Sequence, residues 1–150
     1  MCCTFFAEFA INLTNKNLAF ATDWCGVKSG AKVDKFKEMH LTKEKAKFVK
    51  CPLIKESPVS IECKVTEIKE MGSHDMFIAE ILSIDADEKY IDDKGAFDIT
   101  KCDLITYANG KYFTLGKQVG KFGYSVQKKK RKWRKYARIV DIFRKTWYDI

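Results

Sequence analysis

Apolar and polar residues alternate along the middle of the chain, and a spacing of two predicts β-strands. In residues 59–66 every second residue is apolar, which is typical of a strand with one buried face. The alternation slips at residues 67–68, which indicates a bulge. Residues 71–75 have the composition of a turn, and residues 76–84 form a second strand-like run. The pattern therefore predicts a long antiparallel hairpin.

The chain before this hairpin predicts one short strand and two short helices. Residues 9–13 are mostly apolar and predict a buried strand. Residues 14–17 offer several possible N-caps for a helix that continues to Trp24, and Gly26 stands where a left-handed C-terminal cap is expected. A second helix is predicted over residues 32–39.

The chain after Leu41 predicts loops and a second hairpin. Pro52 and Pro58 bracket an irregular connection, and residues 85–101 read as an acidic loop. Residues 104–115 contain an Asn-Gly pair between two strand-like runs, which predicts a hairpin. The fold class that follows is mainly β with short helices (α+β), with one domain over residues 1–126.

Composition limits the class of protein. The chain has 150 residues, of which 46% are hydrophobic and 32% charged, as expected for a single globular domain. Its longest apolar runs fall well short of the roughly 18 residues that a membrane span needs. The first residues lack the basic and apolar regions of a signal peptide, so we expect a cytoplasmic location.

Motif content excludes several kinds of chemistry. The six cysteines include no C-x-x-C pair, and there are only two histidines, so we expect free thiols and no metal site. The sequence motifs of P-loop NTPases, α/β-hydrolases and zincins are all missing. The sequence predicts no catalytic residues of these classes.

The positive charge is concentrated at the C-terminus. Residues 127–150 hold ten Lys or Arg against two Asp, which accounts for the net charge of +8 and leaves residues 1–126 neutral. Apolar residues recur there at steps of three and four, which predicts a basic amphipathic helix. This tail either packs its aromatic stripe on the body with its lysines in solvent, or binds nucleic acid or an anionic membrane.

Two segments are candidates for binding an anion. In residues 25–36, Ser29 and Gly30 lead into the second predicted helix and lysines stand at positions 28, 32 and 35, where backbone amides and cations suit a phosphate. Residues 72–77 place His74 in a hairpin turn, where it can donate a hydrogen bond. The competing interpretations are a polar loop with solvated lysines and a histidine that only caps its own turn.

Six segments carry a resemblance to a known family. In chain order they are FAINL (9–13), DWCG (23–26), SG (29–30), VDKF (33–36), GSHDMF (72–77) and FGYSV (122–126). Together they resemble the flavin reductase-like, flavoredoxin-type family over residues 8–126. The resemblance implies an antiparallel, Greek-key FMN-binding split β-barrel and a homodimer. It also implies an oxidoreductase that passes electrons between a nicotinamide, NAD(P)H, or a protein donor and a flavin or other acceptor.

The resemblance also implies which residues meet the cofactor. The candidate FMN-binding residues are Asn12, Ser29, Gly30, Lys35, His74 and Phe122. A cation at Lys35 would counter negative charge on the reduced ring or on the phosphate. His74 would donate a hydrogen bond to the flavin, and Phe122 would pack near it.

The chain departs from the family pattern at both ends. Family members have several strands before the one matched by residues 9–13, so we expect an incomplete barrel over residues 1–126. The basic residues 127–150 are extra. The alternative function is therefore a non-enzymatic or degenerate β-rich module whose tail binds nucleic acid or anionic membrane.

Overall fold

The computed structural model describes residues 7–126, so the predicted C-terminal helix lies outside the described residues. The chain divides into two compact units, one ending at Leu115 and the other beginning at Gly116. Within the described residues, no helix is both long enough and apolar enough to span a membrane.

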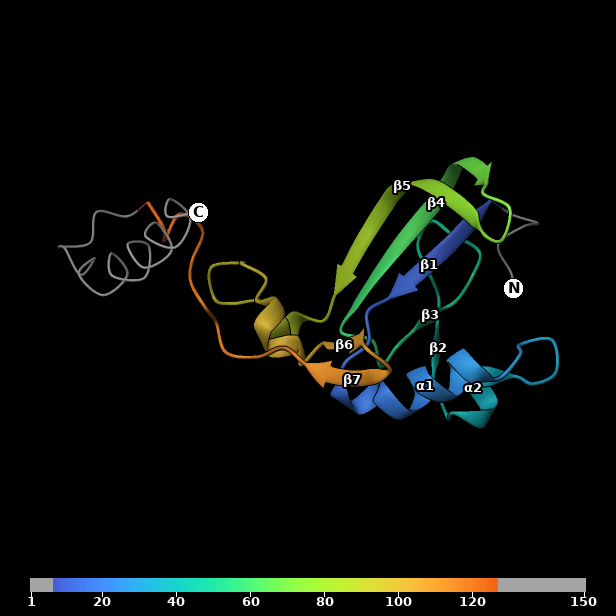
Figure 1. Ribbon diagram of the computed structural model, residues 1–150, viewed down its shortest axis with the longest axis horizontal. Coiled ribbons are helices and arrows are strands. Elements are labelled where there is room, and N and C mark those ends of the chain that lie inside the picture. Colours follow the sequence, from blue (N-terminus) through green and yellow to red (C-terminus); the bar gives the residue numbers. More distant parts are fainter. Residues whose placement is uncertain (1–6, 127–150) are drawn as a thin grey trace, which may run out of the picture. The chain divides into compact units, whose positions relative to one another are not determined.

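The main sheet has three antiparallel strands (Figure 1). They are β1 (Glu8–Asn12), β4 (Val59–Glu70) and β5 (Asp75–Ala86), with β4 in the centre. The predicted long hairpin is confirmed, and both of its strands extend beyond the predicted ends. The pairing shifts between Val65 and Glu67, next to the predicted bulge, and a second time between Glu62 and Cys63.

Two helical segments follow β1. Asn15 caps the short 3-10 helix η1 (Lys16–Leu18), because its Oδ1 accepts hydrogen bonds from Asn17 N and Leu18 N at 3.1 Å. Helix α1 (Ala19–Val27) continues from it, and α2 (Lys35–Glu38) is shorter than predicted. The prediction of a left-handed cap at Gly26 is wrong, since Gly26 lies inside α1 and the helix ends in extended backbone at Lys28.

The remaining elements are short. They are β2 (Lys43–Glu44), β3 (Leu53–Ile54), the 3-10 helices η2 (Glu88–Tyr90) and η3 (Ile99–Cys102), β6 (Ile105–Ala108) and β7 (Lys111–Thr114). β3 lies inside the connection predicted to be irregular, and it pairs with β2. The β6–β7 hairpin is confirmed, with Asn109 and Gly110 both at positive φ in its turn.

The sheet is covered on the side that its sequence pattern assigns to solvent. Ser60 is 6% exposed and Glu62 is fully buried, because residues 46–53 lie over this side of β4. The core consists of Ala46, Val49 and Leu53, with Ala10, Cys51 and Leu82 packed against them. On the opposite side Val59 and Cys63 are buried as predicted, but larger apolar side chains of β1 and β5 are exposed.

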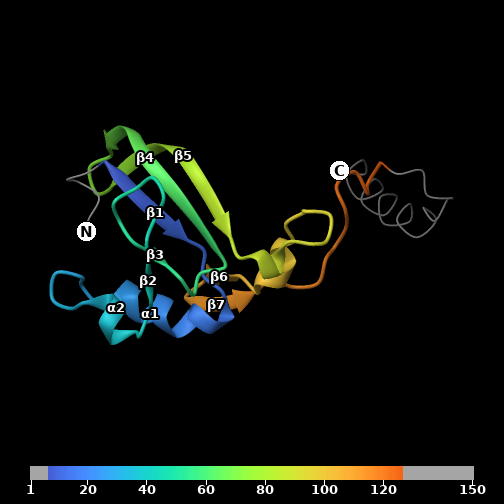
Figure 2. The same ribbon diagram turned by 180° about the vertical axis from the view of Figure 1, so that it is seen from behind.

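The mainly β fold class with short helices is confirmed by this arrangement, and Figure 2 shows the same elements from behind. The expectation of free thiols holds for the four cysteines among the described residues, which are Cys25, Cys51, Cys63 and Cys102.

Candidate flavin site

The loop between α1 and α2 is folded around Lys35. Its Nζ donates a hydrogen bond to the Cys25 carbonyl oxygen at 2.6 Å, which ties the start of α2 to the end of α1. Ser29 forms a tight turn inside the loop, since its carbonyl accepts from Lys32 N and its Oγ accepts from Ala31 N. Ser29 and Gly30 are exposed, and Lys35 is half-buried. The hydrogen bond of Lys35 therefore joins the two ends of the loop.

The start of α2 does not offer its amides to a ligand. Asp34 Oδ1 accepts hydrogen bonds from Phe36 N at 3.0 Å and Lys37 N at 3.3 Å. Asp34 therefore caps α2 and pairs with two of the amides at its start. The lysine side chains of this segment are the other groups that can bind an anion, and those of Lys28 and Lys32 are exposed.

His74 lies in the turn between β4 and β5 and is exposed to solvent. Its Nδ1 is 2.9 Å from Ser73 Oγ, and its carbonyl oxygen accepts from Met71 N at 2.9 Å. Gly72 takes a φ of +86° in this turn, which is a conformation that glycine adopts readily. Nε2 has no hydrogen-bond partner among residues 7–126, so it is available to a ligand.

Asn12 already has protein partners on the covered side of the sheet. Its Oδ1 accepts hydrogen bonds from Ile54 N at 3.0 Å and from Ser60 Oγ at 2.9 Å. These contacts join β1 to β3 and β4.

Phe122 belongs to the second compact unit and its side chain is fully exposed.

Five of the six predicted residues belong to the first compact unit. Three cavities of about 370, 490 and 530 Å³ are lined by other residues. In Figures 1 and 2 the α1–α2 loop and the β4–β5 turn are separate, and no hydrogen bond joins them among the described residues. Among the predicted residues of the first unit, Ser29 and Gly30 of the α1–α2 loop lie next to Lys35, the first residue of α2.

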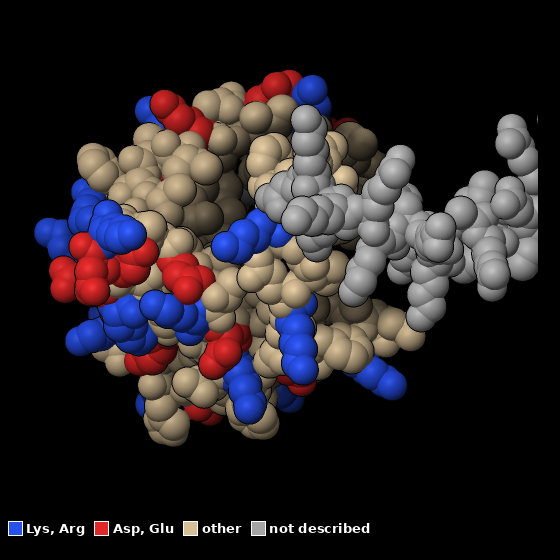
Figure 3. Space-filling model, turned by 90° about the vertical axis from the view of Figure 1, so that its left-hand side faces the viewer, with Lys and Arg blue, Asp and Glu red and all other residues tan. Residues whose placement is uncertain are grey.

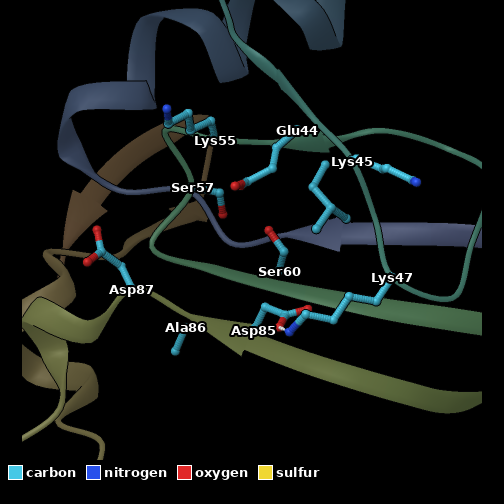
Figure 4. Close-up of a pocket in the computed structure, with 10 residues that line it drawn as sticks. Glu44, Lys45, Lys47, Lys55, Ser57, Ser60, Asp85, Ala86 and Asp87 are labelled. Carbon is cyan, nitrogen blue, oxygen red and sulfur yellow. Dashed lines mark hydrogen bonds and ion pairs between the residues drawn. The ribbon is translucent and has the colours of Figure 1, made fainter.

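The cavity of about 370 Å³ has a mixed polar lining (Figure 4). Glu44 and the hydroxyls of Ser57 and Ser60 face its interior, while Lys47 and Asp85 form an ion pair at its edge. The hydrogen bond from Lys47 to Asp85 raises the pKa of the lysine. Figure 3 likewise shows acidic and basic side chains interspersed over one face of the molecule. This cavity therefore offers neither an apolar platform nor a single sign of charge to a flavin.

The sequence pattern missed the most deeply buried charged side chain. Glu62 accepts hydrogen bonds from the backbone N of Lys47, Phe48 and Val49, at 2.9, 2.7 and 3.0 Å. Three amide donors satisfy the carboxylate, so it stabilises the loop over the sheet. In the sequence, Glu62 is one polar residue in a regular alternation of polar and apolar residues, and this pattern does not predict its contact with residues 47–49.

Comparison with known proteins identifies the fold family. Residues 6–116 match the flavin reductase like domain. The chain belongs to that family. This match confirms the resemblance seen in the sequence, and it includes both the α1–α2 loop and the β4–β5 turn.

Individual relatives agree with this assignment. An uncharacterised protein of Archaeoglobus fulgidus is 37% identical over 107 residues, which cover 71% of this chain and 59% of the relative. The flavoredoxin of Desulfovibrio vulgaris (Miyazaki F) is 29% identical with a TM-score of 0.76, and the match covers 83% of this chain and 68% of that one. The flavoredoxin of Methanosarcina acetivorans is 31% identical with a TM-score of 0.71, and the match covers 83% of this chain and 68% of that one.

A more distant structure describes the fold. The split barrel domain of a putative flavin reductase from Shewanella frigidimarina is 20% identical with a TM-score of 0.65, covering 76% of this chain and 59% of that one. The predicted split-barrel fold is confirmed by such neighbours. The chain of this flavin reductase-like protein spans less than two thirds of the length of the curated relatives it matches.

Proposed function

We propose that this protein binds FMN non-covalently and acts as a flavin-dependent oxidoreductase. The observation that carries the proposal is the family match over residues 6–116, because flavoredoxins are among the neighbours at about 30% identity. A neighbour from Thermus thermophilus is itself an FMN-binding protein. Bound FMN would supply the electron-transfer chemistry, and the chain would hold and orient it.

Lys35 is the residue best placed to hold the negative charge of FMN. Its ammonium group has three N–H donors, and one of them is used by the Cys25 carbonyl oxygen. Two donors remain for anionic oxygens, on the phosphate or on the reduced ring. Because the Cys25 contact fixes the side chain before a ligand arrives, little conformational entropy is lost on binding.

His74 is proposed as a second donor to the flavin, acting through Nε2. Its contact with Ser73 holds Nδ1, which leaves the other ring nitrogen directed at a ligand. Ser29 and Gly30 shape the loop around Lys35, and Asn12 and Phe122 remain proposed contacts. The electron donor is a nicotinamide or a protein, and the family resemblance supports a homodimer that holds FMN near its subunit interface.

Flavin retention tests this function. The chain is mixed with excess FMN, passed through a desalting column, and the protein fraction is measured in the flavin absorption band. We expect FMN to elute with the protein, and anaerobic NADH or NADPH to bleach the bound flavin if a nicotinamide is the donor. A colourless protein fraction at every FMN concentration would contradict the proposal.

A further inference from the structure

The cavity of about 370 Å³ is lined by residues of β2 and β3 and by the end of β5 (Figure 4). It is here called the serine cavity, because Ser57 and Ser60 line it. Its volume lies within the range of roughly 300 to 1,000 Å³ that is typical of small-molecule sites. The six residues proposed to contact FMN are not among those that line it. The serine cavity is therefore a candidate site for a second ligand.

The two serine hydroxyls present hydrogen-bond acceptors to this cavity. Ser57 Oγ donates to the carbonyl oxygens of Leu13 and Val59, at 2.8 and 2.7 Å. Ser60 Oγ donates to Asn12 Oδ1 at 2.9 Å, and Ser60 is 6% exposed. A hydroxyl group has one proton to donate and two lone pairs that accept. Because both protons are used within the fold, the oxygens that face the cavity are left to accept hydrogen bonds.

Glu44 adds a charged acceptor to the serine cavity. Its carboxylate faces the interior in Figure 4. Among the described residues, this carboxylate has no hydrogen-bond or ion-pair partner. Two lysines of the lining, Lys45 and Lys55, point their ammonium groups away from the interior in the same view. The Glu44 carboxylate is therefore free to bind a donor.

The other charged side chains of the lining are already paired. Lys47 forms an ion pair with Asp85 at the edge of the cavity. Asp87 forms an ion pair with Lys89, whose Nζ lies 2.6 Å from Asp87 Oδ2. The hydrogen bond with Asp85 is the main cause of the raised pKa of Lys47, and the charge of Glu44 has a smaller effect. The interior is left with one unpaired negative charge and two neutral acceptors.

We propose that the serine cavity binds the primary ammonium group of a small aliphatic amine. An ammonium group has three N–H donors and no acceptor. These donors match the Glu44 carboxylate and the hydroxyl oxygens of Ser57 and Ser60, whereas an anion would find no donor among these three groups. Leu53 and Ala86 also line the cavity, and they give the alkyl chain of the amine an apolar contact.

Amide chemical shifts test this binding directly. The isotope-labelled full chain is titrated with n-butylamine at pH 7, where this amine is an ammonium ion, and two-dimensional NMR spectra follow the amides of Glu44, Ser57 and Ser60. We expect saturable shifts at these positions. Butyrate has the opposite charge, and tetramethylammonium has the charge but no N–H donor, so neither should cause such shifts. FMN is left out, so the result does not depend on the proposed function.

Two matched variants locate the ammonium group. Glu44→Gln removes the charge that faces the cavity, and Glu80→Gln removes the same charge from a position on β5 outside the cavity. Because both glutamates are exposed, both variants should keep the circular dichroism spectrum of the wild type. We expect Glu44→Gln to weaken the binding of n-butylamine by about fivefold, and Glu80→Gln to leave it unchanged.

Three results would overturn the proposal. The first is a wild-type titration with n-butylamine that gives no saturable shift at the three amides. The second is equal affinity for n-butylamine in the wild type and in both variants. The third is an equal response to butyrate or to tetramethylammonium, which would show that the cavity does not select N–H donors.

Discussion

Glu62 is the residue whose environment differs most from its sequence pattern. Its carboxylate is fully buried and accepts three backbone hydrogen bonds from residues 47–49. Period-two alternation identifies the polar side of a strand, but it contains no information on whether a distant loop will cover that side. The same limit explains why the sequence places Ser60 in solvent, whereas the structure buries it.

Removing this carboxylate should be costly. Glu62→Ala leaves three buried or half-buried amides without an acceptor, so we expect the free energy of unfolding to fall by about 3 kcal/mol. Urea denaturation measures the change. Glu67→Ala is the control, an exposed carboxylate on the same strand, and should cost at most about 0.5 kcal/mol. Equal losses in the two variants would contradict the assigned role of Glu62.

Glu56 gives the fold a pH-dependent contact. Desolvation raises the pKa of its carboxyl group, but hydrogen bonds from Thr42 and from its own backbone amide outweigh this and hold the pKa below its usual value. A lowered pKa in the folded state means that the contact stabilises the protein at neutral pH and is lost as the pH falls through the acidic range.

The variant Glu56→Gln tests this contact. Because Glu56 is exposed to solvent, we expect a loss of only about 0.5 kcal/mol in the free energy of unfolding near pH 7. The difference from wild type should be smaller at pH 3, because the wild-type carboxyl takes up protons as the pH falls. Denaturant curves at the two pH values measure it, and a difference that grows in acid would show that the sign is wrong.

At the scale of elements, local turn chemistry made both hairpins predictable. The Asn109-Gly110 turn and the Gly72 turn require positive φ, and the sequence supplies residues that adopt it readily. Helix ends were less predictable. The sequence offers Gly26 as a terminating residue, but α1 continues through it, and the chain ends α1 at Lys28 without a left-handed residue.

The variant Gly26→Ala decides between these two descriptions by the sign of its effect. Gly26 lies in α1, and an added Cβ would meet no heavy atom within 4 Å. Alanine should therefore stabilise the protein by about 0.5 kcal/mol, because it loses less backbone entropy in a helix. Thermal unfolding measures the change. A decrease in stability would favour the left-handed cap that the sequence suggests.

At the scale of the whole molecule, the family was predictable because short motifs keep their order across residues 9–77. The site was less predictable. The family resemblance predicts that Lys35 and His74 bind the same flavin, whereas the structure places Lys35 at the start of α2 and His74 in the separate β4–β5 turn.

The central claim is that Lys35 holds a flavin, and an equilibrium titration tests it most directly. Flavin fluorescence is followed as the chain is added to FMN, for wild type, Lys35→Met and the control Lys37→Met, whose lysine lies on the same helix but is exposed. The account predicts saturable binding by wild type and Lys37→Met, and binding weaker by about tenfold or more in Lys35→Met. No saturable binding by wild type, or equal affinities in all three proteins, would contradict it.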